Sequence, residues 1–179
     1  MKNILVISAS ARKEGNSDLL CDSFIKGAKE NAHQVEKIFL NDRKINYCTG
    51  CGYCFKNEGQ CSQKDDMGEI YDKMIKADVI VMATPIYFYT MNGQMKTFID
   101  RMCSVYRKVS DKDFYFIMCA ADTTADAMDR AMEEFRGFTS CLEGASEKGI
   151  LCGTSLWERG DVKKSKYLEE AYEMGKGVK

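Results

Sequence analysis

The chain has 179 residues, of which 26 are basic and 27 acidic, so its formal net charge is −1. This balance gives no reason to expect nucleic acid or an anionic membrane surface as a partner. No apolar stretch approaches the length of a membrane span, and the first residues run into a strand pattern too early for a signal peptide. We therefore expect a cytoplasmic protein with no membrane partner, folded as a single domain over residues 1–179.

Short apolar runs alternate with helical patterns along the chain. The first half predicts a strand at 3–7, a helix at about 17–32 with Ser17 as its N-cap, a strand at 35–40 and a helix capped by Asp65 and Asp66. The second half predicts strands at 79–83, 114–119 and 149–152, each followed by a helix.

Five strands that alternate with helices indicate an α/β fold, a three-layer sandwich in which helices cover both faces of a five-stranded parallel sheet. With the mixed polar and apolar strand 35–40 at the edge, the flavodoxin-like strand order 2-1-3-4-5 is the simplest arrangement. Ligands of such sheets bind outside the carboxyl ends of the strands.

The usual residues of side-chain acid–base hydrolysis are missing. His33 is the only histidine, and its place before the second strand favours a surface or helix-end position. No Gly-x-Ser-x-Gly or His-Glu-x-x-His motif occurs. We expect no side chain to act as the catalyst, and an enzyme with this sequence would use a cofactor for its chemistry.

A polar loop, residues 8–17, joins the first strand to the first helix. A helix N-terminus points unpaired backbone N–H groups at such a loop and favours an anion. The hydroxyls of Ser8, Ser10 and Ser17, the Asn16 amide and the Arg12 cation can complete a cradle for a phosphate. The alternative is an ordinary connection, because the loop matches neither a dinucleotide fingerprint nor a nucleotide-hydrolysing P-loop.

Two further loops should lie at the same edge of the sheet. Pro85, the only proline, should end its strand at Thr84, and the large side chains of residues 86–91 follow. Flat aromatic side chains can cover a planar ligand, and Asn92-Gly93 can bring backbone amides to its edge. A subunit contact is the alternative for this apolar loop.

Four of the nine cysteines, Cys48, Cys51, Cys54 and Cys61, form a cysteine-rich loop at residues 48–61. Two overlapping x2 spacings let one turn of loop present three thiolates to a [4Fe–4S] cluster, with the fourth a few residues later. Free redox-active thiols, zinc and a disulfide remain alternatives. The other five cysteines, at 21, 103, 119, 141 and 152, are expected at inert core positions.

The motifs together resemble a known family. They are Ser10-x-Arg12-x-x-Gly15-Asn16-Ser17, Asp65-Asp66-Met67, Thr84-Pro85-Ile86-Tyr87-Phe88 and Asn92-Gly93-x-Met95-Lys96-x-Phe98-Ile99-Asp100-Arg101. Over residues 1 to about 103 the chain is similar to the NAD(P)H-dependent FMN reductases, and most similar to their iron–sulfur flavoprotein branch.

The resemblance implies FMN, with its phosphate at Ser10, Arg12, Asn16 and Ser17. The ring would lie along residues 84–93, which include Thr84, Pro85, Ile86, Tyr87, Phe88, Asn92 and Gly93, with Ala121 and Asp122 on its far side. It also implies a homodimer or homotetramer with the flavin near the subunit interface. For the cysteine motif it leaves two outcomes open: iron–sulfur flavoproteins use this kind of compact motif for a [4Fe–4S] cluster, whereas many relatives with similar loops are described simply as flavin reductases.

On this basis we expect an FMN-dependent oxidoreductase. It would take a hydride from NAD(P)H and pass electrons to a small-molecule acceptor or a redox protein. The alternative is a non-enzymatic flavin or iron–sulfur electron carrier, or a redox-sensing module. NADH and NADPH fit the sequence equally well.

Overall fold

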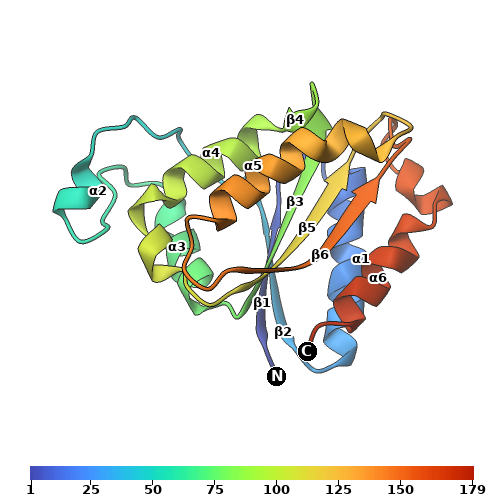
Figure 1. Cartoon of the computed structure of the whole chain (residues 1–179), viewed down its shortest axis with the longest axis horizontal. Coiled ribbons are helices and arrows are strands. Elements are labelled where there is room, and N and C mark those ends of the chain that lie inside the picture. Colours follow the sequence, from blue (N-terminus) through green and yellow to red (C-terminus); the bar gives the residue numbers. More distant parts are fainter.

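The structure, a computed structural model, describes residues 1–179 as a central sheet between two groups of helices (Figure 1). The strand order is β2-β1-β3-β5-β6, and these five strands are parallel. Because β5 and β6 correspond to the fourth and fifth predicted strands, this is the predicted flavodoxin-like order. The strands are β1 (Asn3–Ser8), β2 (Gln34–Phe39), β3 (Val79–Tyr87), β5 (Asp113–Cys119) and β6 (Ser146–Gly153).

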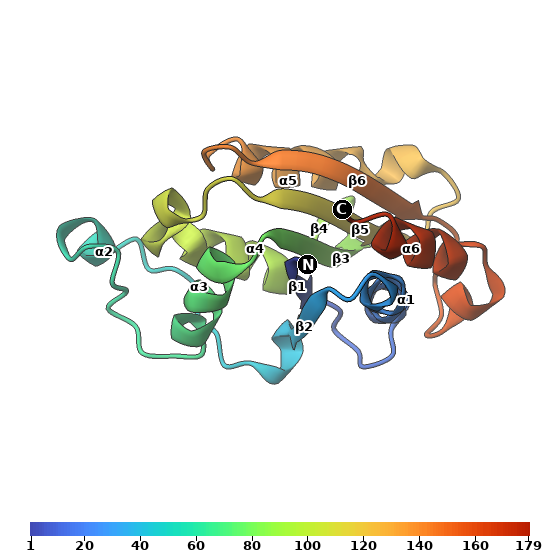
Figure 2. The same ribbon diagram turned by 90° about the horizontal axis from the view of Figure 1, so that it is seen from below.

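Helices cover both faces of the sheet, as predicted (Figure 2). On one face lie α1 (Asn16–Glu30) and α6 (Tyr167–Lys176), and on the other lie α3 (Met67–Lys76), α4 (Gly93–Arg101) and α5 (Asp129–Thr139). The short α2 (Tyr53–Lys56) belongs to a loop that projects from the body (Figures 1 and 2). Five 3₁₀ turns complete the chain: Leu40–Asp42, Met102–Ser104, Tyr106–Lys108, Ala125–Met128 and Asp161–Lys164. None of the helices has the length and apolar character needed to cross a membrane.

The apolar runs of the strands contribute side chains to two hydrophobic cores, one on each face of the sheet. In β1, Ile4 and Val6 pack toward α1 and α6, whereas Leu5 and Ile7 pack toward α3, α4 and α5. Successive side chains of a strand point to opposite faces, so a strand covered on both sides must be apolar throughout. The three central strands are therefore largely buried, whereas the edge strands β2 and β6 are partly exposed, and the carboxyl ends of the strands present loops to solvent.

Two details of the expected boundaries are wrong. Pro85 does not end its strand, because β3 continues to Tyr87 and returns as the antiparallel strand β4 (Thr90–Met91). A proline restricts the residue before it to extended conformations, and an extended Thr84 is compatible with a continuing strand. The helix α1 begins at Asn16 with Gly15 as its N-cap, so Ser17 lies inside the first turn rather than capping it.

Candidate functional site

A cavity of about 680 Å³ opens at the carboxyl ends of β1, β3 and β5. This volume lies in the range of small-molecule and cofactor sites. The residues that line it are Ser10, Ala11, Arg12, Gly15, Asn16, Ser17, Pro85, Ile86, Tyr87, Phe88, Cys119, Ala121, Leu156, Trp157 and Glu158. The three loops expected at one edge of the sheet therefore contribute to a single cavity.

One end of the cavity is formed by the loop after β1 and the first turn of α1. Ser10 Oγ donates to the Arg12 carbonyl oxygen at 2.8 Å, which closes the loop on itself. Gly15 is required by close packing, because a Cβ there would lie 2.5 Å from Ser10 Oγ. The exposed Arg12 side chain takes part in no hydrogen bond or ion pair with the protein, and the first-turn N–H groups of α1 have no helical partners. This end can bind an anion.

A buried carboxylate lies beneath this loop. Asp18 accepts hydrogen bonds from Ser8 Oγ at 2.9 Å and from the Glu14 backbone N–H at 3.1 Å. Lys37 Nζ lies 2.6 Å from the same carboxylate and neutralises its charge. Burial lowers the pKa of Lys37, but hydrogen bonds to Asp18 and Asp22 outweigh burial and hold that pKa above its ordinary value. Ser8 thus supports the loop from below and does not line the cavity.

Asn16 connects this end of the cavity to a segment that the sequence analysis did not include. Its Nδ2 donates to the carbonyl oxygens of Leu156 at 3.2 Å and Glu158 at 2.9 Å, and its Oδ1 accepts from Gly160 N at 3.0 Å and Val162 N at 3.2 Å. The side-chain amide is thus occupied by the segment 156–162. The assignment of Asn16 to a phosphate remains a prediction, for which its backbone N–H is available.

The segment held by Asn16 adds Leu156, Trp157 and Glu158 to the cavity wall. Trp157 is the only tryptophan of the chain, and 73% of it is exposed. No motif marks this segment, and only an aromatic residue just after the last strand could have indicated it. It is the fourth loop at the same edge of the sheet.

The hairpin of β3 and β4 forms the other end of the cavity. Pro85, Ile86, Tyr87 and Phe88 line it, and Phe88 at the tip is 96% exposed. Phe88 and Tyr89 have φ values of 51° and 66°, in the left-handed region that tight hairpin turns require. A large aromatic side chain held in this strained conformation and left exposed is a candidate contact surface.

Thr84 and Asn92 lie behind the hairpin. Both are almost fully buried, and Asn92 caps α4 by accepting a hydrogen bond from Met95 N at 3.1 Å. Asn92 Nδ2 also donates to the Ala9 carbonyl oxygen, which ties the hairpin to the loop after β1. Neither residue lines the cavity, nor do Gly93 and Asp122, whereas Ala121 does. Their predicted contacts with the flavin stay predictions.

The cysteine-rich loop forms a second, smaller pocket of about 70 Å³ away from the sheet edge. Cys48, Cys51, Cys54 and Cys61 all line it. A hydrogen bond from Ser62 lowers the pKa of the Cys51 thiol. All nine cysteines are free thiols, and no three Cys, His, Asp or Glu side chains surround a point where a single metal ion would bind.

The expectation for the other five cysteines is partly wrong. Cys21 and Cys119 are buried, and Cys152 is half-buried. Cys141 is exposed because it follows the last turn of α5, where no layer covers the helix end. Cys103 lines the cysteine pocket, because the 3₁₀ turn after α4 packs against the projecting loop. Its sequence position, 42 residues after Cys61, gave no signal for this contact.

The comparison with protein families agrees with this geometry. The sequence pattern described as NADPH-dependent FMN reductase matches residues 2–144, which is most of the chain. The chain belongs to this family. The match includes the loop after β1, the β3–β4 hairpin and the loop after β5, and therefore most of the wall of the 680 Å³ cavity.

The curated relatives of this chain include iron–sulfur flavoproteins and a putative flavin-containing oxidoreductase. An iron–sulfur flavoprotein of Archaeoglobus fulgidus is 43% identical over 96 residues, which are 54% of this chain and 43% of the relative. A putative NAD(P)H-dependent FMN-containing oxidoreductase of Bacillus subtilis is 29% identical over 111 residues, covering 62% of this chain and 58% of the relative. The chain spans about half the length of the curated relatives it matches.

Solved structures confirm the fold. An NAD(P)H:quinone oxidoreductase from Methanothermobacter marburgensis has a TM-score of 0.79 at 13% identity and covers 99% of each chain. A flavone reductase has a TM-score of 0.74 at 21% identity and covers 97% of this chain and 60% of the other. At these identities the likeness establishes the flavodoxin-like architecture.

Proposed function

We propose that the protein is an FMN-dependent oxidoreductase that takes a hydride from NAD(P)H and passes electrons to a small-molecule or protein acceptor. One observation carries the proposal: a single cavity joins an anion-binding end, at Arg12 and the start of α1, to an aromatic end, at the β3–β4 hairpin. A flavin mononucleotide has the same two parts, a phosphate and a flat ring. The family membership supports this choice of ligand.

The residues of the cavity would bind and orient the cofactor. Arg12 and the backbone N–H groups of Asn16 and Ser17 would hold the phosphate, and Ser10 keeps their loop in shape. Pro85, Ile86, Tyr87 and Phe88 would lie along the ring and exclude water from it. When bound, FMN would accept the hydride and pass the electrons on, so that no side chain need act as an acid, base or nucleophile.

We further propose that the cysteine-rich loop binds a [4Fe–4S] cluster. Five soft thiol donors line one pocket, four of them from the cysteine-rich loop, and this donor set fits an iron–sulfur cluster. The curated relatives named iron–sulfur flavoproteins support this choice. Cys48, Cys51, Cys54 and Cys61 would be the ligands.

A second copy of the chain would cover the exposed aromatic tip of the hairpin. Phe88 is 96% exposed and lies at the rim of the cavity, where a partner subunit would bury it and close the site. We therefore propose a homodimer or homotetramer. Molecular mass in solution, measured for the native chain and for Phe88→Ser, tests this part.

The single tryptophan provides a direct test of the main proposal. FMN added to flavin-free protein should quench the fluorescence of Trp157, because this residue lines the cavity. Riboflavin, which lacks the phosphate, should bind more weakly. Protein that leaves FMN free in a parallel ultrafiltration measurement would contradict the proposal.

Anaerobic addition of NADH or NADPH to the FMN complex then distinguishes the two functional classes. Loss of flavin absorbance within the time of a catalytic cycle supports the reductase. Bleaching only in the presence of a separate reductase would instead make the protein an electron carrier. Iron and acid-labile sulfide, counted in anaerobically prepared protein, test the cluster, and Cys51→Ser should remove its absorbance while leaving the flavin bands.

A further inference from the structure

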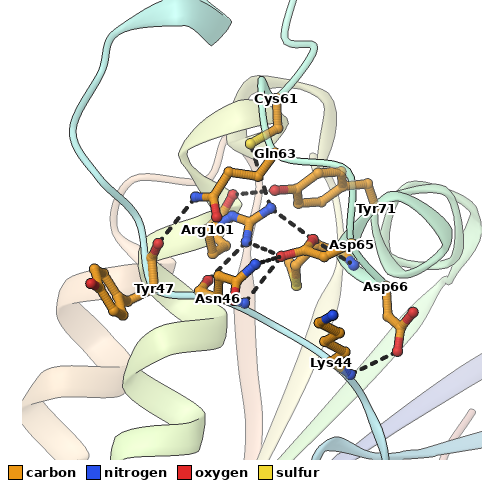
Figure 3. Close-up of polar contacts among 10 residues, drawn as sticks. Lys44, Asn46, Tyr47, Cys61, Gln63, Asp65, Asp66, Tyr71 and Arg101 are labelled. Atoms are coloured by element: carbon orange, nitrogen blue, oxygen red, sulfur yellow. Dashed lines mark hydrogen bonds and ion pairs between the residues drawn. The ribbon is translucent and has the colours of Figure 1, made fainter.

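Arg101, the last residue of α4, is a buried cation next to the cysteine-rich loop (Figure 3). Only 2% of it is exposed. Its guanidinium holds the Asp65 carboxylate with two hydrogen bonds, Nη1 to Oδ2 at 2.6 Å and Nη2 to Oδ1 at 2.9 Å. Burying such a pair is costly unless its geometry is good and its other donors are used. The destinations of the other donors are therefore informative.

One of these donors is directed at a residue just before the cysteine-rich loop and one at a cysteine within it. Arg101 Nη1 donates to the Asn46 carbonyl oxygen at 2.8 Å, and Nη2 donates to Cys61 Sγ at 3.4 Å. Nε is buried without a partner. The Tyr71 hydroxyl of α3 donates to the Arg101 carbonyl oxygen at 2.8 Å, which fixes the end of α4 from the other side. The guanidinium is thus held in one orientation, with one N–H group directed at a sulfur.

The loop begins and ends beside this guanidinium. The Asn46 backbone N–H donates to Asp65 Oδ2 at 3.0 Å. This hydrogen bond joins the segment before the cysteines to the segment after them. Gln63 Nε2 donates to the Tyr47 carbonyl oxygen at 3.1 Å (Figure 3). We call these four residues, Asn46, Tyr47, Gln63 and Asp65, the neck of the loop. Arg101 contacts the neck and one cysteine inside it.

The loop has no hydrophobic core of its own to replace these contacts. None of residues 48–62 is buried, and Phe55 is 67% exposed. A segment without buried apolar side chains opens at low free energy unless polar contacts hold it. Outside the neck, the loop is hydrogen-bonded to the rest of the protein through Lys108 Nζ, which donates to the Glu58 carbonyl oxygen at 3.0 Å.

We propose that Arg101 is the positioning residue of the cysteine-rich loop. It holds the neck closed and directs an N–H group at Cys61 Sγ, so that this sulfur faces the pocket shared with the other cysteines. The N–H group directed at Cys61 Sγ also stabilises the negative charge of the thiolate-ligated cluster bound there, a part that rests on the proposed function. A cation hydrogen-bonded to a ligand sulfur favours the reduced, more negative state and so raises the reduction potential.

Two variants separate these effects from a general loss of stability. Arg101→Lys keeps the charge but loses the planar fork that reaches Asp65 and Cys61 together. The double variant Asp65→Asn/Arg101→Gln removes the buried charges as a pair, so that no unpaired charge is left in the interior. Arg136→Gln is the matched control, because Arg136 holds Glu147 through two nitrogens, contacts no residue of the cysteine-rich loop and is exposed.

The first measurement is limited trypsin digestion of protein without a cluster, which reports on the neck. Cleavage after Lys56 or Lys64 should be about tenfold faster in Arg101→Lys than in the native chain, the change that loss of one charged hydrogen bond gives. The control should be cleaved at the native rate. Unchanged cleavage in Arg101→Lys would overturn the positioning role. Circular dichroism identifies a variant that has unfolded. If the double variant unfolds, the digestion of Arg101→Lys alone decides the positioning role.

The second measurement is the midpoint potential of the cluster after anaerobic reconstitution, followed by its visible and paramagnetic signals. Both variants should hold less iron, and the double variant should have a more negative potential than the native chain. A merely structural role would reduce the iron content without moving the potential of the cluster that remains. Native protein that takes up no iron would remove the cluster from the proposed function and the charge effect with it, and the digestion alone would then decide the role of Arg101 at the neck.

Discussion

Asn16 Nδ2 donates a hydrogen bond to the carbonyl oxygen of Leu156, although the two residues are separated by 140 positions in the sequence. This bond joins the first residue of α1 to the loop that carries Trp157. The candidate phosphate end and the tryptophan wall of the cavity are therefore one connected unit. A change at Asn16 should affect both.

We expect Asn16→Ala to weaken FMN binding and to reduce the free energy of unfolding by about 2–3 kcal/mol, since it leaves buried backbone groups of residues 156–162 unpaired. Urea unfolding and FMN titration measure the two effects. Asn31→Ala is the control, because Asn31 lies at the opposite end of α1 and donates to the Lys176 carbonyl oxygen of α6 in an exposed contact. If the two variants bind FMN equally well, Asn16 does not organise the cavity.

Arg12→Ala should weaken FMN binding by about 1.5–3 kcal/mol, the value of a hydrogen bond to a charged group. Its effect on riboflavin binding should be small, because riboflavin has no phosphate. Arg159→Ala is a matched control, since Arg159 lies beside the cavity wall and already pairs with Glu14 at 3.1 Å. Equal losses for FMN and riboflavin would place the phosphate elsewhere.

The helices α1 and α6 pack so closely that glycine is needed in both. A Cβ on Gly27 would lie 2.0 Å from the Tyr172 carbonyl oxygen, and one on Gly175 would lie 2.0 Å from the Phe24 carbonyl oxygen. Gly27→Ala should therefore destabilise the protein by about 1–3 kcal/mol, as overpacking does, although alanine is the better helix former. Gly137→Ala in α5 meets no atom within 4 Å and should stabilise slightly. Thermal unfolding of the two variants should give shifts of opposite sign.

The buried pair of Asp65 and Arg101 predicts a dependence of stability on acid. Burial raises the pKa of Asp65, but hydrogen bonds from Arg101 and from the Asn46 and Met67 backbones outweigh burial and hold that pKa below its ordinary value of 3.8. The unfolded chain therefore binds more protons than the folded chain as the pH falls through this range. The contribution of Asp65 is complete above the unfolded-state pKa and is lost as the pH falls through the lower folded-state pKa.

Urea unfolding at pH 7 and at about pH 3 measures this contribution. Asp65→Asn should cost about 3–5 kcal/mol at pH 7, because it leaves the Arg101 charge buried and unpaired. The difference between native protein and Asp65→Asn should become smaller at about pH 3, because the Asp65 carboxyl of the unfolded chain takes up its proton there while the pKa of the folded carboxyl lies lower. A difference that stays constant between the two pH values would mean that Asp65 does not titrate with folding.

The cysteines outside the loop should differ in reactivity. Iodoacetamide should modify Cys141 in the native protein, because this thiol is exposed. Cys21 should react only after unfolding, since it is buried and burial raises its pKa to about 12. Mass spectrometry of peptides from the native and urea-unfolded protein gives both extents. Modification of Cys21 in the native state would contradict its place in the core.

Much of the fold could be predicted because it depends on local patterns. The run Ile4-Leu5-Val6-Ile7 is apolar at every position, which is typical of a strand covered on both faces, and its neighbours β2 and β3 follow from the connection rules of parallel sheets. The β3–β4 hairpin was not predicted. Pro85 limits its neighbour without ending the strand, and two aromatic residues in left-handed conformations, at 88 and 89, give no turn signal.

Part of the candidate site could be predicted because the position of a loop follows from the strand that precedes it. The loops after β1, β3 and β5 meet because parallel strands end at one edge, so Ser10, Arg12 and Pro85 could be placed together from the sequence. Whether a polar side chain in such a loop faces the cavity or the protein interior depends on which hydrogen-bond partners it meets in the folded chain. Asn92 and Thr84 turned out to hydrogen-bond each other behind the hairpin, which no spacing indicates.

The sequence by itself determined the alternation of strands and helices, the apolar character of the buried strands and the presence of a compact cysteine run, since periodicity and spacing depend only on neighbours along the chain. The tertiary structure alone decided that Asn16 holds the Trp157 loop, that Cys103 joins the cysteine pocket and that Arg101 contacts Cys61. Each of these contacts joins segments brought together by packing, and a periodic pattern specifies which side of an element is buried but not which distant side chain meets it there.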